Sequence, residues 1–241
     1  MESEFINSLC DKKFDEEFDK ISLLKRYPWV GVNYASSKCR VLILGDSHYA
    51  QEEDGKFSQE EYDVSQQDKN YTRGIINCVI SDIHKNEPTW KMYSGLLNTF
   101  MDTDISPKNA NEFWSKVAFY NFIQETMRSS SDKPSNENKK EGWNCLVEVA
   151  KVLNPDQIIM FGIRNWWGLE YQQLGELIWF NERISNCEPA TGHLNISMSD
   201  KKIQKIPLAI IHHSAQGYDP SAWQKYLQEN AKKAMEYLMN N

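Results

Sequence analysis

The chain has 241 residues, of which 40% are apolar, and its 34 acidic and 27 basic side chains give a formal net charge of −7. This balance argues against a protein that holds duplex DNA mainly through its phosphates, because such proteins carry a basic excess. No apolar run approaches the length of a membrane span, and no charged-then-apolar leader follows Met1. We therefore expect a cytoplasmic protein that does not enter a membrane.

Four short apolar runs predict strands, and all of them are continuous rather than alternating. Such runs are typical of strands buried on both faces, as in a parallel sheet covered by helices. The expected fold class is α/β, a three-layer α/β/α sandwich with a central, mainly parallel four-stranded sheet. We expect a single domain over residues 1–241, with residues 1–39 as an N-terminal helical extension. The four runs are Val41–Leu44, Val117–Tyr120, Ile158–Phe161 and Leu208–Ile211.

Helical periodicity fills much of the chain between these runs. Apolar residues at helical spacing predict helices over residues 90–100 and 143–153. A C-terminal helix is expected behind Asp219, because aspartate is a good N-cap and a proline follows it at the first helical position. The polar segment 129–140 (SSSDKPSNENKK) predicts a mobile loop.

Polar residues follow every apolar run at the point where it ends. In a parallel sheet the carboxyl ends of the strands share one edge, where ligands bind, so we expect one shared cleft. Each of these residues taken alone is more typical of a turn or cap, and their coincidence at four strand ends indicates a site. They are Gly45-Asp46-Ser47-His48-Tyr49, then Asn121, then Gly162-Ile163-Arg164-Asn165, and finally His212-His213-Ser214.

The first of these segments permits an ester hydrolase. Gly45-Asp46-Ser47 after a strand resembles the nucleophile block of SGNH-type hydrolases, which implies that Ser47 attacks an ester while a histidine takes its proton. That family also has an Asp-x-x-His pair near the C-terminus. No histidine of this chain has an acid three residues before it, which weakens the hydrolase hypothesis.

The order of motifs resembles the uracil-DNA glycosylase superfamily over about residues 40–225. The matching segments are LILGDSHY (42–49), FWSKVAFYN (113–121), NPDQIIMFGIRNWW (154–167) and AIIHHSAQGYDPSAW (209–223). The resemblance implies a parallel sheet between helices and an acidic loop with an aromatic after the first strand. It also implies an asparagine that reads the base edge and a histidine loop after the last strand.

This resemblance assigns roles to the strand-end residues. Breaking an N-glycosidic bond leaves cationic character on the sugar and negative charge on the base. Asp46 is the expected carboxylate near the sugar and His212 the donor to the departing base. Asn121 would read the base edge and Tyr49 would form a wall of the pocket. The other expected base- or substrate-binding residues are Gly45, Ser47, His48, His213 and Ser214.

Structural roles are open for the same residues. Asp46 suits the cap of a turn, Asn121 the cap of a following helix, and His212 or His213 a hydrogen-bonded structural histidine. A module that binds a nucleotide or base without chemistry is therefore a third class beside the glycosylase and the hydrolase.

Departures from the family pattern narrow the range of substrates that we expect. Uracil enzymes with the strongest catalytic carboxylate carry it two residues after the glycine, where this chain has Ser47, whereas Asp46 matches other branches. His213 replaces the proline of His-Pro-Ser, and the acidic segment 52–63 would repel a phosphate backbone. We expect a nucleobase-containing partner such as single-stranded or modified DNA, or a free nucleoside, rather than intact duplex.

No cofactor or metal is expected. The five cysteines lie far apart without a CxxC pair, which fits reduced thiols. Asp46, His48, His212 and His213 would bind a divalent metal only if their side chains converged, and their spacing matches no metal motif.

Overall fold

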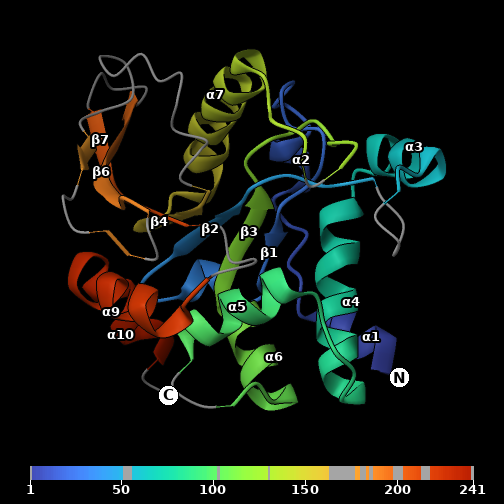
Figure 1. The fold of residues 1–241 in the computed structure, drawn as a ribbon, viewed down its shortest axis with the longest axis horizontal. Helices are drawn as coiled ribbons and strands as arrows, with labels where there is room; N and C mark the ends of the chain where they lie inside the picture. The colour runs from blue at the N-terminus through green and yellow to red at the C-terminus, as the bar shows by residue number, and fades with distance from the viewer. Residues whose placement is uncertain are drawn as a thin grey trace.

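The computed structural model describes residues 2–50, 56–101, 104–129, 131–162, 177–179, 183–184, 187–197, 203–212 and 218–239. Its strands are β1 (Trp29–Val30), β2 (Val41–Gly45), β3 (Val117–Asn121), β4 (Gln157–Phe161), β5 (Leu177–Trp179), β6 (Ala190–Ser197) and β7 (Ile203–Ile211). They form one seven-stranded sheet in the order β1-β3-β2-β4-β7-β6-β5 (Figure 1).

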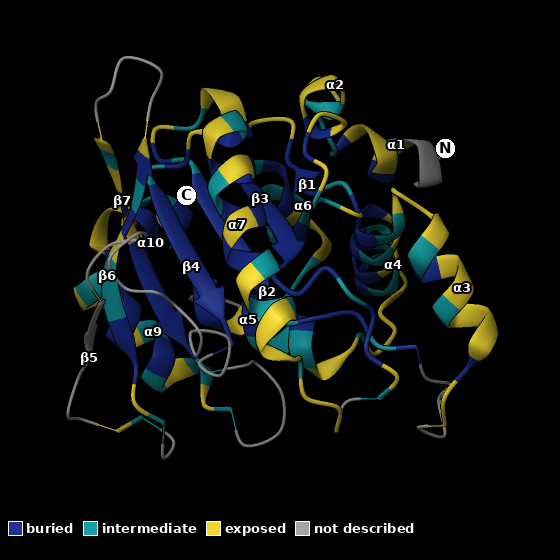
Figure 2. Cartoon of the chain, turned by 90° about the horizontal axis from the view of Figure 1, so that it is seen from above, coloured by how far each residue is buried: buried dark blue, intermediate teal, exposed yellow. Residues whose placement is uncertain are grey.

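Helices lie on both faces of this sheet (Figure 2). The described helices are α1 (Glu2–Ser8), α2 (Asp15–Phe18), α3 (Gln59–Gln67), α4 (Tyr71–Lys85), α5 (Lys91–Phe100), α6 (Pro107–Lys116), α7 (Asn136–Leu153), α9 (Pro220–Asn230) and α10 (Lys232–Met239), with a 3-10 turn η1 (Tyr34–Ser36). None of these helices is long and apolar enough to cross a lipid bilayer.

The four predicted strands form the centre of the sheet, which confirms the expected α/β class. β3, β2, β4 and β7 are neighbours in that order, and all three pairings between them are parallel. Every residue of β2, β3 and β4 is buried. The prediction from the continuous apolar runs, that these strands are covered on both faces, is therefore confirmed.

The predicted number of four strands is wrong, because three further strands extend the sheet antiparallel at its two sides. β1 pairs with β3, while β6 pairs with β7 and β5 with β6. β6 has buried, intermediate and exposed residues interspersed, and β1 has two residues. A search for continuous apolar runs misses strands of both kinds, since a half-exposed strand has polar residues between its apolar ones.

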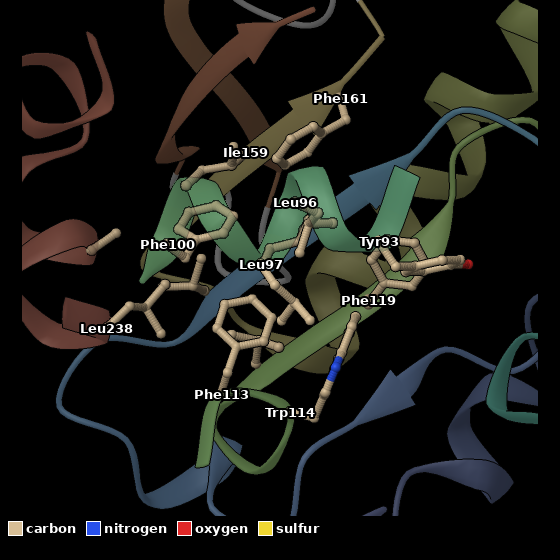
Figure 3. Packing of buried hydrophobic residues seen from close by; sticks show 14 of the residues in the cluster. Tyr93, Leu96, Leu97, Phe100, Phe113, Trp114, Phe119, Ile159, Phe161 and Leu238 are labelled. Carbon is tan, nitrogen blue, oxygen red and sulfur yellow. The ribbon is translucent and has the colours of Figure 1, made fainter. Parts of the chain in front are cut away.

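Side-chain alternation along the central strands divides the core into two layers. Val41 and Ile43 of β2 face the layer that α4, α5, α6, α9 and α10 cover, whereas Leu42 and Leu44 face α7. In the first layer, aromatic rings of α5 and α6 pack on the sheet (Figure 3). The rings of Trp114 and Phe119 meet at right angles with centroids 5.8 Å apart. This packing holds β3 from one side.

The N-terminal segment does more than add helices. Residues 1–39 contain α1, α2 and η1, as a helical extension requires, but also β1. The indole N–H of Trp29 in β1 donates to the carbonyl of Trp114 at 2.8 Å, and Trp29 is fully buried. The segment is therefore hydrogen-bonded into the sheet.

Segment 129–140 is only partly a loop, which corrects the prediction made from its polar composition. α7 begins at Asn136 behind a capping box, in which Ser135 Oγ accepts from the Asn138 N–H at 3.1 Å and Asn138 Oδ1 accepts from the Ser135 N–H at 3.0 Å. The first turns of α7 are mostly solvent-exposed, so their sequence is polar. The C-terminal helix begins behind Asp219 as predicted and breaks at Ala231 into α9 and α10.

The capping box predicts a measurable contribution to stability. Ser135→Ala removes the acceptor for the Asn138 N–H, so we expect the free energy of unfolding to fall by about 1 kcal/mol in urea titrations. Ser221→Ala, at an exposed serine within α9, is the matched control and leaves the midpoint unchanged. Equal effects of the two substitutions would contradict the capping role.

Candidate functional site

The strand order creates a topological switch point between β2 and β4. From β2 the chain passes to β3 on one side, and it later enters β4 on the other side of β2. In open parallel sheets, ligands bind outside the carboxyl ends of the strands at such a point. β2 ends at Gly45 and β4 at Phe161, so Asp46 and Gly162 flank the switch point.

Gly45 leaves space for the amide of Asn121. The two residues are register partners at the ends of β2 and β3. A Cβ at position 45 would lie 2.1 Å from Asn121 Oδ1 and 2.9 Å from Phe119 Cζ. The glycine that ends the first apolar run is therefore required by the packing of its neighbour strand.

Asn121 carries a buried acceptor without a partner. The residue is 4% exposed, and its Oδ1 has no hydrogen-bond partner within the described part of the chain. Leaving such an atom unpaired costs about 1–3 kcal/mol, so it needs an explanation. The helix-capping alternative for Asn121 is wrong, because among the described residues the next helix, α7, begins only at Asn136.

The loops that follow β2 and β3 run side by side. The N–H groups of Phe122 and Ile123 donate to the carbonyls of Gly45 and Asp46 at 3.0 and 2.9 Å. Further along, the Met127 N–H donates to the His48 carbonyl at 2.8 Å, and the Ala50 N–H donates to the Met127 carbonyl at 2.9 Å. The backbone around Asp46 is therefore fixed by the loop after β3.

Arg26 fixes that second loop. Its guanidinium is almost fully buried and donates to the carbonyls of Ser65 in α3 and Gln124, and to Thr126 Oγ1. The bonds to Ser65 and Thr126 are both 2.6 Å long. Burial lowers the pKa of Arg26, with the carboxylate of Glu125 acting in the opposite direction. A buried guanidinium thus joins α3 to the loop after β3.

Asp46 and Tyr49 lie together at the edge. The Tyr49 hydroxyl donates to Asp46 Oδ2 at 3.3 Å, and both residues are partly exposed. Tyr49 also forms an isolated parallel bridge with Met127. The carboxylate therefore keeps contact with solvent while a phenol orients it.

Ser47 and His48 do not form a nucleophile–base pair. Ser47 is 4% exposed, and its Oγ has no hydrogen-bond partner within the described segments. His48 Nε2 lies 2.9 Å from Thr72 Oγ1, and its ring meets Tyr71 edge-on at 4.9 Å. Burial, with a smaller effect of Arg26, lowers the pKa of His48 to about 3. His48 is therefore a neutral histidine held against α4.

His212 lies at the same edge, beyond the end of β7. Phe161 and Ile211 are register partners, and the Gly162 N–H donates to the Ile211 carbonyl at 3.0 Å. β7 is two strands from β2, which corresponds to about 10 Å across the sheet. Gly162 has φ 147°, a conformation that favours glycine. In the described residues, no three potential ligands gather to hold a metal.

Several predicted site residues fall outside the described part of the chain. These are His213, Ser214, Ile163, Arg164 and Asn165. The described residues bring together Gly45, Asp46, Tyr49 and Asn121, with His212 on the same edge.

Two residues whose side chains hydrogen-bond to the loops of this edge, Arg26 and Thr72, were not predicted from the sequence. Arg26 contacts carbonyls 39 and 98 residues away, and Thr72 is 24 residues from His48. Such partners leave no local pattern, because no fixed spacing links them. The polar residue types at both positions are the one signal that sequence offered.

No protein-family model matches this chain, and a search of the curated proteins finds no relative of it. Function is therefore inferred from the geometry of the strand ends.

The neutral His48 predicts acid-sensitive stability. Unfolded, its imidazole has a pKa near 6.5, whereas in the folded protein the pKa is about 3. Between these two pKa values the unfolded chain binds a proton that the folded chain does not. The contribution of His48 to the free energy of unfolding is therefore complete above about pH 6.5 and decreases as the pH falls toward 3. We expect the free energy of unfolding to decrease from pH 7 to pH 4, and His48→Gln to flatten this decrease.

The matched control is His193→Gln, at an exposed histidine of β6. It should leave the pH dependence as it is in the unmodified chain. An unchanged slope in His48→Gln would show that His48 does not carry the effect.

Arg26 predicts coupling between stability and the loops at the edge. Arg26→Leu leaves buried acceptors without a hydrogen bond, and each unpaired acceptor costs about 1–3 kcal/mol. We therefore expect the free energy of unfolding to fall by roughly 3 kcal/mol or more. Amide hydrogen exchange at Met127 and Ala50 should accelerate, since their N–H groups join the two loops. Lys25→Leu, which removes a surface ion pair with Glu125, should cost about 1 kcal/mol or less.

Proposed function

We propose that this chain binds a nucleobase at the carboxyl edge of the sheet and hydrolyses its N-glycosidic bond. In this proposal it is a divergent relative of the uracil-DNA glycosylase superfamily, and its helices and sheet form the three-layer α/β/α sandwich of that superfamily. The parallel core and the motif order along β2, β3, β4 and β7 support the proposal.

The observation that carries the proposal is the amide oxygen of Asn121, which has no hydrogen-bond partner among the described residues. Asn121 Oδ1 is buried beside Gly45 at the end of β3, next to the switch point. An amide offers both an acceptor and donors, which matches the Watson–Crick edge of a base. A base that donates to Oδ1 would satisfy this buried acceptor.

Asp46 and His212 supply the chemistry in this proposal. A carboxylate at Asp46 stabilises positive charge that develops on the sugar, and Tyr49 orients it through the hydrogen bond to Oδ2. His212 donates to the departing base and so stabilises its negative charge. The roughly 10 Å between β2 and β7 is a distance that a nucleoside bound across the strand ends can span.

Acidic side chains near the edge favour an uncharged or short substrate. α3 follows the loop after β2 and carries exposed Glu60, Glu61 and Asp63. These carboxylates would repel a long phosphate backbone. We therefore expect a free nucleoside or a short single strand with a modified base to be used before intact duplex.

The test is a base-release assay on free nucleosides and on single- and double-stranded oligonucleotides that contain uracil, hypoxanthine or modified bases. Asp46→Asn and His212→Ala should each reduce kcat by about 100-fold or more, as expected for loss of a charge-stabilising or general acid group. Asn121→Ala should mainly raise KM. Glu229→Gln, at an exposed glutamate of α9, is the matched control and should retain full activity.

Two outcomes would reject the glycosylase proposal. Cleavage of a short-chain ester that disappears in Ser47→Ala, with no base released, would establish the hydrolase instead. The buried Ser47 Oγ, which has no hydrogen-bond partner among the described residues, argues against that result. Binding of a base that Asn121→Ala weakens, without release in any assay, would identify a binding module.

A further inference from the structure

A second site candidate lies at the opposite, amino edge of the sheet. A pocket of about 590 Å³ is lined by the residues before β2, the last residue of α6 and helix α10. Lys38 and Cys39 precede β2, and Lys116 precedes β3. The length of a five-residue strand, roughly 17 Å, separates this pocket from Asp46.

Three lysines converge on this pocket from three separate segments. They are Lys38 before β2, Lys116 at the end of α6 and Lys233 in α10. Lys116 is largely buried and pairs with Glu112 at 2.7 Å. Lys38 and Lys233 are exposed, and neither makes a hydrogen bond or ion pair with another described residue.

The acidic side chains near these cations already pair with other basic residues. Glu236 is the one acidic side chain that lines the pocket, and it already pairs with Lys232 at 3.7 Å. Asp156 interacts electrostatically with Lys233, but it already forms an ion pair with Arg40 at 3.1 Å. The ammonium groups of Lys38 and Lys233 thus form no hydrogen bond or ion pair with a described residue. Like charges that share a pocket repel one another, so an anion between them is favoured.

The remaining walls are well defined. The Tyr237 hydroxyl donates to Ser37 Oγ at 2.8 Å, and Lys116 Nζ lies 5.5 Å from the centroid of the Tyr237 ring. Cys39 is 1% exposed, and burial raises the pKa of its thiol, which therefore stays uncharged. The lining of the pocket therefore combines a hydrogen-bonded tyrosine and a buried, uncharged thiol with the ammonium groups of three lysines.

We propose that this pocket binds a small phosphorylated molecule. Lysine is a point-charge binder of phosphate, and the pocket volume lies within the range of sites for one small ligand. An extended polyanion fits less well, because the chain as a whole is acidic and its own field opposes a long phosphate backbone. The site is separate from the edge at Asp46 and does not depend on the function proposed there.

Calorimetric titration of the full chain with inorganic phosphate and with a nucleoside monophosphate tests the proposal. We expect binding, and the double variant Lys38→Gln/Lys233→Gln should weaken it about tenfold or more, since hydrogen bonds to charged groups contribute about 1.5–3 kcal/mol. Glu236→Gln should tighten binding, because it removes the acidic side chain from the lining. Lys225→Gln, at an exposed lysine of α9, is the matched control.

The two probes separate the sources of the phosphate group. Similar affinity for both would mean that the pocket recognises the phosphate alone, whereas tighter binding of the monophosphate would add contacts to its organic part. The proposal would be overturned if neither probe bound, or if the double variant bound the probes as tightly as Lys225→Gln does. Base release at the other edge should be unaffected by these substitutions, so the two proposals fail independently.

Discussion

The closeness of β2 and β3 at their carboxyl ends depends on the missing side chain of Gly45. Any Cβ there would overlap the Asn121 amide, so either the strands would separate or the amide would turn away. The backbone bonds from Phe122 and Ile123 to Gly45 and Asp46 exist because the strands stay in register. One absent methyl group thereby determines where Asp46, Tyr49 and Asn121 lie.

Local stretches of sequence contained much of the central fold. The continuous apolar runs at 41–44, 117–120, 158–161 and 208–211 belong to strands covered on both faces, and burial on two faces leaves a pattern that can be read without partners. β6 was not predicted, because a half-exposed strand has the composition of a loop. The start of α7 escaped for the same reason, since solvent-facing helical turns are polar.

The candidate site was less predictable than the strands. A parallel sheet brings strand ends to one edge, so Asp46 and Asn121 were expected as neighbours, and the register of Gly45 with Asn121 makes them so. The role of His48 was not predictable, because its neutrality results from burial and, to a smaller extent, from the charge of Arg26. Only the folded chain buries the ring against Tyr71 and Thr72. Two residues only two positions apart thus have opposite environments, because Asp46 is partly exposed to solvent and His48 is buried.

The lengths of the outermost strands have a consequence for association between chains. β1 at one side of the described sheet has two residues and β5 at the other has three, whereas the strands between them have five to nine. Unpaired N–H and C=O groups along an outer strand are templates on which a foreign strand can add, and short outer strands expose few of them. On the β1 side, the described sheet therefore presents few such groups to the strand of another chain, even though its centre consists of apolar runs that would pair readily in an unfolded chain.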